Sequence, residues 1–225
     1  MGVLGRICRL LEGETVQMKN LLIAGAGGFG REVFDMILEM PEFSVAGFLS
    51  DVPTALDDYP EIRAEAGIVG TIAGYKFHAG ELVVNAIGDV AGRKKVAEIL
   101  RENGASFVNL IHPTAFVSKF ARLGEGVIIC RGAGVSTGVE LGDFVMVNAS
   151  ATVGHDAKVG AYSVISPHVS IGGFAEIGAG TFIGANASVA PRKKIGRGSQ
   201  ISANSFAARD TGEEALIVGV PGREF

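Results

Sequence analysis

An aliphatic residue stands at every sixth position through the second half of the chain. The series runs through fifteen positions without an insertion, and the residue after each aliphatic is small, as at Gly124, Gly142 and Gly160. An α-helix repeats every 3.6 residues and a strand every two, whereas a solenoid of short strands and tight turns can repeat every six. The sequence therefore predicts a β-solenoid with inward-stacking aliphatics. These are Val117, Leu123, Ile129, Val135, Leu141, Val147, Val153, Val159, Ile165, Ile171, Ile177, Ile183, Val189, Ile195 and Ile201.

Each hexad has an aliphatic, a small residue, two variable residues, a further small or β-branched residue and one more. This pattern resembles that of the hexapeptide-repeat acyltransferases, and it covers residues 117–206. The resemblance implies a left-handed parallel β-helix with three hexads per coil. Fifteen hexads then make about five coils, a prism roughly 24 Å tall at about 4.8 Å between strands. Lys193 places a cation at a normally small inward position, so we expect the last coil to be irregular.

The first half is predicted to be a small Rossmann-like α/β unit. Buried-strand patterns alternate with helical patterns, which is typical of parallel strands joined by helices. The expected elements are a strand at 19–25, a helix at 31–40, a strand at 44–49, a strand at 81–88, a helix at about 93–102 and a strand at 106–111.

A glycine-rich turn, GAGGFG at residues 25–30, joins the first strand to the first helix. Its GxGxxG spacing lets the backbone approach a phosphate, and the helix N-terminus offers free N–H groups. Asp51, about twenty residues further on, could take a ribose hydroxyl. A nicotinamide dehydrogenase is a competing interpretation, but about ninety residues with four strands make only half of a dinucleotide fold. Tight strand-to-helix packing is another reason for such glycines.

Composition excludes several classes. With 48% hydrophobic and 20% charged residues the chain is globular, and no apolar run approaches the roughly 18 residues of a membrane span. A net charge of -4 disfavours a nucleic-acid binder. Cys8 and Cys130 form no disulfide or metal pattern, which fits a reducing cytoplasm. Residues 1–17 lack the apolar core and cleavage pattern of a signal peptide.

Both halves together resemble the sugar O- and N-acetyltransferases of the sialic acid O-acetyltransferase and nucleotide-aminosugar N-acetyltransferase type. The resemblance rests on LLIAGAGGFGREV, AIGDVAGRKK, NLIHPTAFVS, VNASATVGHDAKVG and VGVPGRE. It implies an N-terminal unit that holds a sugar nucleotide, and homotrimers that bind acetyl-CoA between neighbouring β-helices. The expected segments are an extension (1–18), a sugar-nucleotide-binding domain (19–111), a β-helix acyltransferase domain (112–206) and a C-terminal tail (207–225).

His155 is the strongest candidate for a catalytic group. It is third in its hexad, so it should project from the coil surface, and one coil of eighteen residues places Thr137 below it and Gly173 above it. An imidazole in such a notch could take a proton from an acceptor while the Gly173 N–H faces an oxyanion. Asp156 could orient the ring. The resemblance implies that His155 is the base of a His-Asp pair and that Asn148 lines the same site.

The resemblance also places the nucleotide sugar at the N-terminal unit. The residues that it implies as contacts are Gly27, Gly28, Phe29, Asp51 and Gly88. Phe29 departs from relatives that carry a histidine in that position, so the sugar need not be the same.

Other polar groups are weaker candidates. Arg192 and Lys194 lie in a basic run that could contact coenzyme A phosphates or form a solvated face. His168 follows a proline at a corner and is expected to be structural, and His112 is expected to cap the β-helix. Some relatives carry a second histidine nine positions after the base, where this chain has Val164.

These observations predict a cytoplasmic, acetyl-CoA-dependent N-acetyltransferase that acts on the amine of a nucleotide-linked amino sugar for bacterial surface glycans. We expect no bound metal, no nucleic-acid partner and no membrane segment. Sugar O-acetylation is the nearest alternative. A non-catalytic sugar-nucleotide scaffold would not need the His-Asp pair, and a β-helical carbonic anhydrase would need three histidines at a zinc ion.

Overall fold

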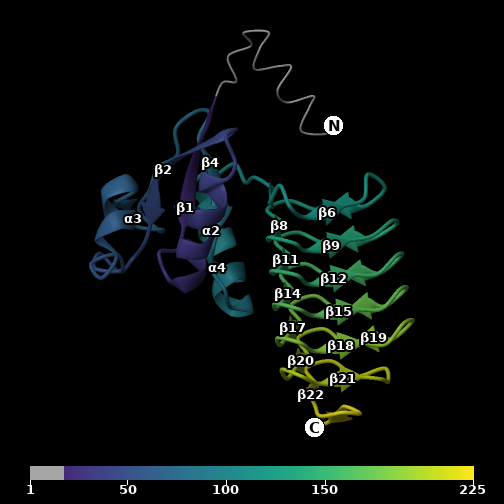
Figure 1. Cartoon of the computed structure of the whole chain (residues 1–225). Helices are drawn as coiled ribbons and strands as arrows, with labels where there is room; N and C mark the ends of the chain where they lie inside the picture. Colours follow the sequence, from purple (N-terminus) through teal and green to yellow (C-terminus); the bar gives the residue numbers. More distant parts are fainter. Residues whose placement is uncertain (1–17) are drawn as a thin grey trace.

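The computed structural model describes residues 18–225, so Cys8 and nearly all of the expected extension lie outside the described residues. The N-terminal unit is a parallel four-stranded sheet, in the order β3-β2-β1-β4, with helices packed against it (Figure 1). Leu21 to Ala24 are buried because both faces of this central strand are covered. The elements are β1 (Lys19–Ala24), α2 (Gly28–Leu38), β2 (Phe43–Leu49), α3 (Pro60–Glu65), β3 (Ile68–Gly70), β4 (Leu82–Asn85) and α4 (Val90–Glu102).

The fourth strand of this sheet is not the one that we expected from sequence. The prediction of a strand at 106–111 is wrong, because Phe107 makes only an isolated parallel bridge to Val83 and residues 110–111 join the β-helix. The short strand β3 takes the fourth place, beside β2. Three residues are too few to give a recognisable alternating pattern.

The second half is a parallel β-helix of two- and three-residue strands, with each strand stacked on the one a coil earlier (Figure 1). One sheet contains β6 (Phe116–Val117), β9 (Gly134–Val135), β12 (Thr152–Val153), β15 (Ser170–Ile171), β18 (Ser188–Val189) and β21 (Phe206–Ala207). The second contains β7 (Arg122–Leu123), β10 (Glu140–Leu141), β13 (Lys158–Val159), β16 (Glu176–Ile177) and β19 (Lys194–Ile195). The third contains β5 (Leu110–Ile111), β8 (Ile128–Ile129), β11 (Met146–Val147), β14 (Val164–Ile165), β17 (Phe182–Ile183), β20 (Gln200–Ile201), β22 (Leu216–Val218) and β23 (Arg223–Glu224).

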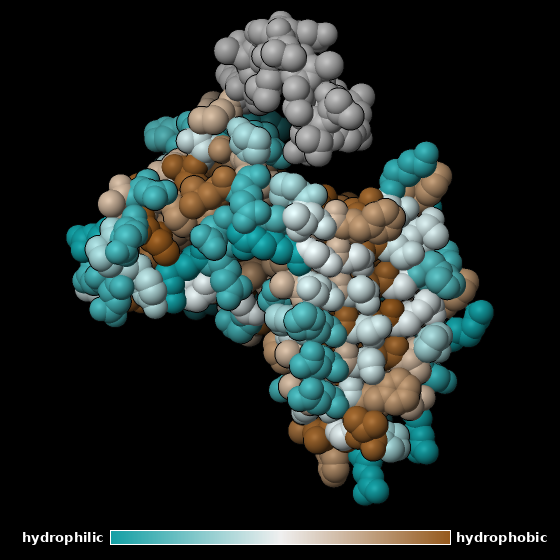
Figure 2. All heavy atoms as spheres, in the orientation of Figure 1, coloured by the Kyte–Doolittle hydropathy of each residue, from teal (hydrophilic) through white to brown (hydrophobic). Residues whose placement is uncertain are grey.

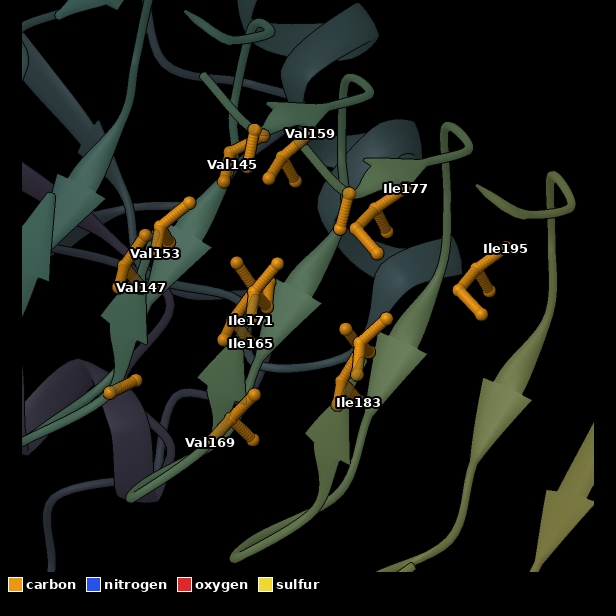
Figure 3. Packing of buried hydrophobic residues seen from close by; sticks show 14 of the residues in the cluster. Val145, Val147, Val153, Val159, Ile165, Val169, Ile171, Ile177, Ile183 and Ile195 are labelled. Carbon is orange, nitrogen blue, oxygen red and sulfur yellow. The ribbon is translucent and has the colours of Figure 1, made fainter. Parts of the chain in front are cut away.

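The predicted aliphatic ladder forms the core of the β-helix (Figure 3). Each hexad places its aliphatic at the end of a two-residue strand, and parallel pairing brings the aliphatics of successive coils into register, as Val153 with Ile171. The repeat extends one hexad beyond each end of the series, to Ile111 and Ala207. Burial of each side chain contributes about 1.5–3 kcal/mol, so the stack itself stabilises the coils.

The three faces of the β-helix differ in chemistry because the residue before each aliphatic points outward. On the sheet of β7 to β19 these residues alternate in charge, with Arg122 paired to Glu140 and Lys194 to Glu176. The sheet of β6 to β21 carries small uncharged residues along its middle, and this face is mostly pale in Figure 2. The third sheet is apolar in its outward residues from β5 to β17, and the N-terminal unit packs on its first coils, where Ile128 is fully buried.

An ion-pair cluster ties α2 to the first coils. Glu39, at the C-terminal end of α2, accepts hydrogen bonds from Arg131 and lies 2.9 Å from Nε2 of the fully buried His112. Nδ1 of His112 lies 2.8 Å from the Thr114 hydroxyl. His112 therefore joins the two units of the chain, beyond the capping role that we expected.

The irregular part of the β-helix comes one coil later than we predicted. The coil that contains Lys193 keeps its register, since β19 pairs with β16 and the Lys193 carbonyl accepts from the Glu176 N–H. The Lys193 side chain is partly exposed and reaches toward Asp210. In the next coil no strand stacks on β19, and residues 208–215 cover it as a loop. Residues 216–224 then close the end with the antiparallel pair β22–β23.

Candidate active site

His155 and Asp156 form a hydrogen-bonded pair at the turn between β12 and β13. Nδ1 of His155 lies 2.9 Å from Oδ2 of Asp156, and both side chains are about half exposed. With the Nδ1 proton donated to the carboxylate, Nε2 is left free to accept a proton. Asp156 adopts a φ of 59°, in the left-handed region that aspartate tolerates better than most residues. The backbone of the turn thus sets the carboxylate beside the ring.

The expected notch around His155 is present. A Cβ on Gly173 would lie only 2.7 Å from Nε2 of His155, so the ring occupies the space that any side chain at residue 173 would need. Below, the Asp156 N–H donates to the Thr137 carbonyl. The Gly173 N–H has no hydrogen-bond acceptor within residues 18–225. That free donor is available to a developing oxyanion.

An aromatic residue that the sequence analysis missed completes this corner. Phe174 makes an edge contact with His155, with ring centroids 5.1 Å apart, and the Arg192 guanidinium lies 4.5 Å from the centroid of the Phe174 ring. Phe174 has a φ of 59°, which is unusual for a bulky residue. Its position one coil above Asp156 was the signal that could have revealed it.

The second group of predicted residues lies in the N-terminal unit, at the carboxyl edge of the sheet. The order of the strands reverses at β1, which has β2 on one side and β4 on the other, so the turns after β1 and β4 diverge, and we call the surface between these two turns the crevice. Gly27 and Gly28 are exposed, and a Cβ on either would meet nothing within 4 Å. The N-terminus of α2 has no side-chain cap and no acidic residue in its first turn. Its N–H groups are open to an anion.

The other predicted substrate-binding residues, Gly88, Asp51 and Asn148, differ in what they contact. Gly88 follows β4 and faces Phe29, whose Cβ would lie 3.7 Å from a Cβ at residue 88. Asp51 is exposed after β2, but its Oδ1 accepts a hydrogen bond from the Ile72 N–H and so helps to hold its own loop. Asn148 follows β11 on the β-helix, and its Oδ1 accepts from the Ala149 N–H. Ala149 packs in the same apolar cluster as Phe29.

The two groups do not meet within one chain. Phe29 and Asn148 lie on the side of the β-helix that the N-terminal unit covers, whereas the turn after β12 lies at the edge away from that unit (Figure 1). His155 makes its hydrogen bond and its ring contact with Asp156 and Phe174, and with no residue of the N-terminal unit. Within a single chain the two groups of candidate residues are therefore separate, and we call them the two half-sites.

The two basic candidate residues near the end of the β-helix, Arg192 and Lys194, lie on different surfaces. Arg192 shares the corner of His155 through its contact with Phe174. Lys194 lies on the charged face, where its ammonium is 3.1 Å from Glu176. A groove of about 590 Å³ follows that face, and its lining includes Lys158 and Lys194.

The other candidate groups are in different surroundings. His168 is exposed at another corner, and Val164 is buried on the sheet that faces the N-terminal unit. Burial raises the pKa of the Cys130 thiol to about 12, so it is protonated at neutral pH and unsuited to act as a nucleophile. Within residues 18–225 no three histidine, cysteine or acidic side chains converge as metal ligands. No helix in that range has the length and apolar character that crossing a bilayer requires.

Comparison with known proteins relates both units to sugar-modifying enzymes. Residues 20–100 match the family model described as the PglD N-terminal domain. UDP-N-acetylbacillosamine N-acetyltransferase from Bacillus subtilis (strain 168) is 32% identical over 112 residues, which are 50% of this chain and 51% of that protein. The chain thus spans about half the length of this curated relative.

Solved structures of acetyltransferases are similar to this chain over 92% of its length. The acetyltransferase domain of PglB from Neisseria gonorrhoeae FA1090, in complex with acetyl coenzyme A, has a TM-score of 0.83, 26% identity and 100% of its own chain covered. PerB from Caulobacter crescentus, in complex with CoA and GDP-perosamine, has a TM-score of 0.81, 29% identity and 97% covered. The predicted resemblance and the predicted fold, an α/β unit followed by a left-handed parallel β-helix, are confirmed.

Proposed function

We propose that this chain, which resembles the nucleotide-aminosugar N-acetyltransferases, transfers an acetyl group from acetyl-CoA to the amine of a nucleotide-linked amino sugar. The observation that carries the proposal is the half-exposed His155–Asp156 pair in a notch that Gly173 leaves open in the next coil. The open glycine loop at α2 supports a nucleotide-bearing acceptor. Similar proteins with bound acetyl coenzyme A or GDP-perosamine support the two substrate classes.

The residues of the notch suit direct transfer to an amine. As the amine nitrogen attacks the thioester carbon, Nε2 of His155 takes the proton that the nitrogen loses. The carboxylate of Asp156 keeps the ring oriented and balances the charge that the imidazolium gains. The Gly173 N–H donates to the oxyanion, and when the carbon–sulfur bond breaks, the proton passes from His155 to the departing CoA sulfur. No covalent bond to the protein is formed.

The separation of the half-sites supports a site shared between subunits. In a homotrimer, the crevice residues and Asn148 of one subunit would face His155, Gly173 and Arg192 of its neighbour. Arg192 is free to approach coenzyme A phosphates at the same corner. Lys194 is a weaker candidate for that contact, because Glu176 already balances its charge.

The enzyme would work in the cytoplasm, where acetyl-CoA and nucleotide sugars are made, and would supply surface glycan synthesis. Acetylation of a sugar hydroxyl is the second candidate, since the same base can take a hydroxyl proton. A binding scaffold is disfavoured by the orientation of His155 toward an open notch.

The test is thiol release from acetyl-CoA in the presence of UDP-, GDP- and dTDP-linked amino sugars and of free amino and hydroxyl sugars. We expect turnover with one class of nucleotide-linked amino sugar and a loss of about 10²–10⁴-fold in His155→Ala. His78→Ala is the matched control, because it removes an exposed histidine from the loop between β3 and β4. Near-normal turnover in His155→Ala would exclude this residue as the base.

A further inference from the structure

Arg93 is a buried charge to which the catalytic scheme assigns no part. It lies in the second turn of α4, where the N–H of Gly92 is already bonded to the N-cap residue Asp89. Its side chain is fully buried, and its Nε and Nη1 have no hydrogen-bond partner within the described residues. Nη2 reaches only the sulfur of Met146, at 3.3 Å, and a thioether is a weak acceptor.

Within the described residues Arg93 makes no ion pair, and the Asp89 carboxylate acts on its charge only through space. Burial lowers the pKa of the guanidinium to about 10, so it stays positive at neutral pH. Asp89 is the acidic side chain nearest to it in the chain, and one of its carboxylate oxygens is engaged with Gly92. The Cys130 thiol is protonated at neutral pH. Burial of an unpaired cation is a substantial cost to folding, and a merely structural side chain would not need the charge.

The guanidinium lies behind the glycine loop. Its Cζ is 5.8 Å from the centroid of the Phe29 ring, which belongs to the first turn of α2. The same turn leaves its N–H groups uncapped, with open space above Gly27 and Gly28. Two positively charged groups, the N-terminus of α2 and the guanidinium of Arg93, therefore lie near the same glycine loop.

We infer that Arg93 is the counter-charge for the diphosphate of a nucleotide bound at the N-terminus of α2. This inference rests on the proposed function. Because Arg93 is fully buried and its guanidinium packs near the Phe29 ring, it is a positioning residue that acts through the field in a poorly solvated region and through that ring. A bound diphosphate then supplies the charge that the free protein lacks, and nucleotide binding should stabilise the fold more than its direct contacts alone would.

The test is Arg93→Met in the full chain, which keeps an unbranched side chain and removes the charge. Calorimetric titration with UDP, GDP, dTDP and their nucleosides is combined with thermal unfolding. We expect the midpoint of the unliganded variant to equal or exceed that of the unmutated protein, since an uncompensated buried charge is gone. Affinity for the preferred nucleoside diphosphate should fall about tenfold or more. Affinity for the nucleoside and for acetyl-CoA should not change.

Two further variants separate the outcomes. Arg101→Met removes an exposed arginine of the same helix that pairs with Glu125, and it should leave nucleotide affinity unchanged. Arg93→Lys keeps the charge and should bind within a few-fold of the unmutated protein. If Arg93→Met does not fold, or binds the diphosphate normally, the inference is overturned and the proposed function stands. If the unmutated protein binds no nucleoside diphosphate, the proposed function itself fails.

Discussion

At the scale of single residues, the candidate site depends on the absence of a side chain at Gly173, beside His155. The imidazole lies where a side chain at residue 173 would have to go, and Phe174 holds the ring from one edge. The turn brings Asp156 to Nδ1 because residue 156 adopts a left-handed conformation. The position of the His155 ring, the proposed base, is therefore set by two neighbouring coils, which fixes it more tightly than one loop could.

Gly173→Ala tests this dependence. The backbone at residue 173 accepts alanine, but the added methyl collides with Nε2 of His155 and must displace the ring. Misplacing a catalytic group by about 1 Å can cost about 10²-fold in rate, so we expect kcat to fall by that order with the fold intact. Gly134→Ala, whose Cβ would make an ordinary 3.6 Å contact with Thr152, should keep full activity. Equal kcat values for both variants would contradict the role of the notch.

At the scale of elements, the attachment of α2 matters most. Its N-terminus is the open glycine loop, and its C-terminal end is held to the β-helix by Glu39, Arg131 and His112. The hydrogen bonds from Arg131 hold the pKa of the Glu39 carboxyl below its ordinary value, with His112 adding to the effect. The orientation of the crevice toward the β-helix thus depends partly on one ionised carboxylate.

Glu39→Gln should show this as a pH-dependent loss of stability. A carboxyl whose pKa is lowered by folding stabilises the protein above its unfolded pKa, and the contribution is lost as the pH falls through the folded value. We expect the variant to unfold a few degrees earlier at pH 7 and the difference to vanish as the pH falls below about 4. Thermal unfolding followed by circular dichroism measures this. The control Glu32→Gln, an exposed change on the same helix, should have no effect, and a difference for Glu39→Gln that persists at low pH would point to packing instead.

At the scale of the whole molecule, the proposed function combines residues of two subunits, because the crevice and the His155 corner lie on different sides of one β-helix. The crevice and Asn148 lie on the side that the N-terminal unit covers, and His155 lies at the far edge. A closed ring of identical subunits can bring each crevice to the next subunit's edge.

Subunit complementation tests this arrangement. His155→Ala removes the base, and Gly27→Leu fills the open space of the crevice while its extended backbone, with a φ of -75°, accepts a side chain. Each variant alone should be nearly inactive. Co-expressed in equal amounts, they should regain about a quarter of the activity, because a random ring then combines an intact crevice with an intact neighbouring histidine at that frequency. No gain after mixing would place each site within one chain.

The sequence by itself determined the features that repeat or act locally. A period of six permits only stacked short strands with an aliphatic core, and the hexad position of His155 sufficed to predict an outward imidazole one coil below Gly173. The glycine turn between β1 and α2 was likewise predictable from the sequence, because backbone freedom and helix dipoles depend only on residues that are neighbours in the chain.

Only the tertiary structure decided which face of the β-helix the N-terminal unit covers, and hence that Arg93 is buried against Met146 and that the crevice and His155 are apart. These outcomes depend on contacts between segments about fifty or more residues apart, where burial and shape decide the partner and no short pattern records it. The strand β3 was missed for a different reason, because its three residues are too few to give a recognisable pattern. Phe174 lies one coil above Asp156, a local signal that the sequence analysis overlooked, and its ring contacts His155.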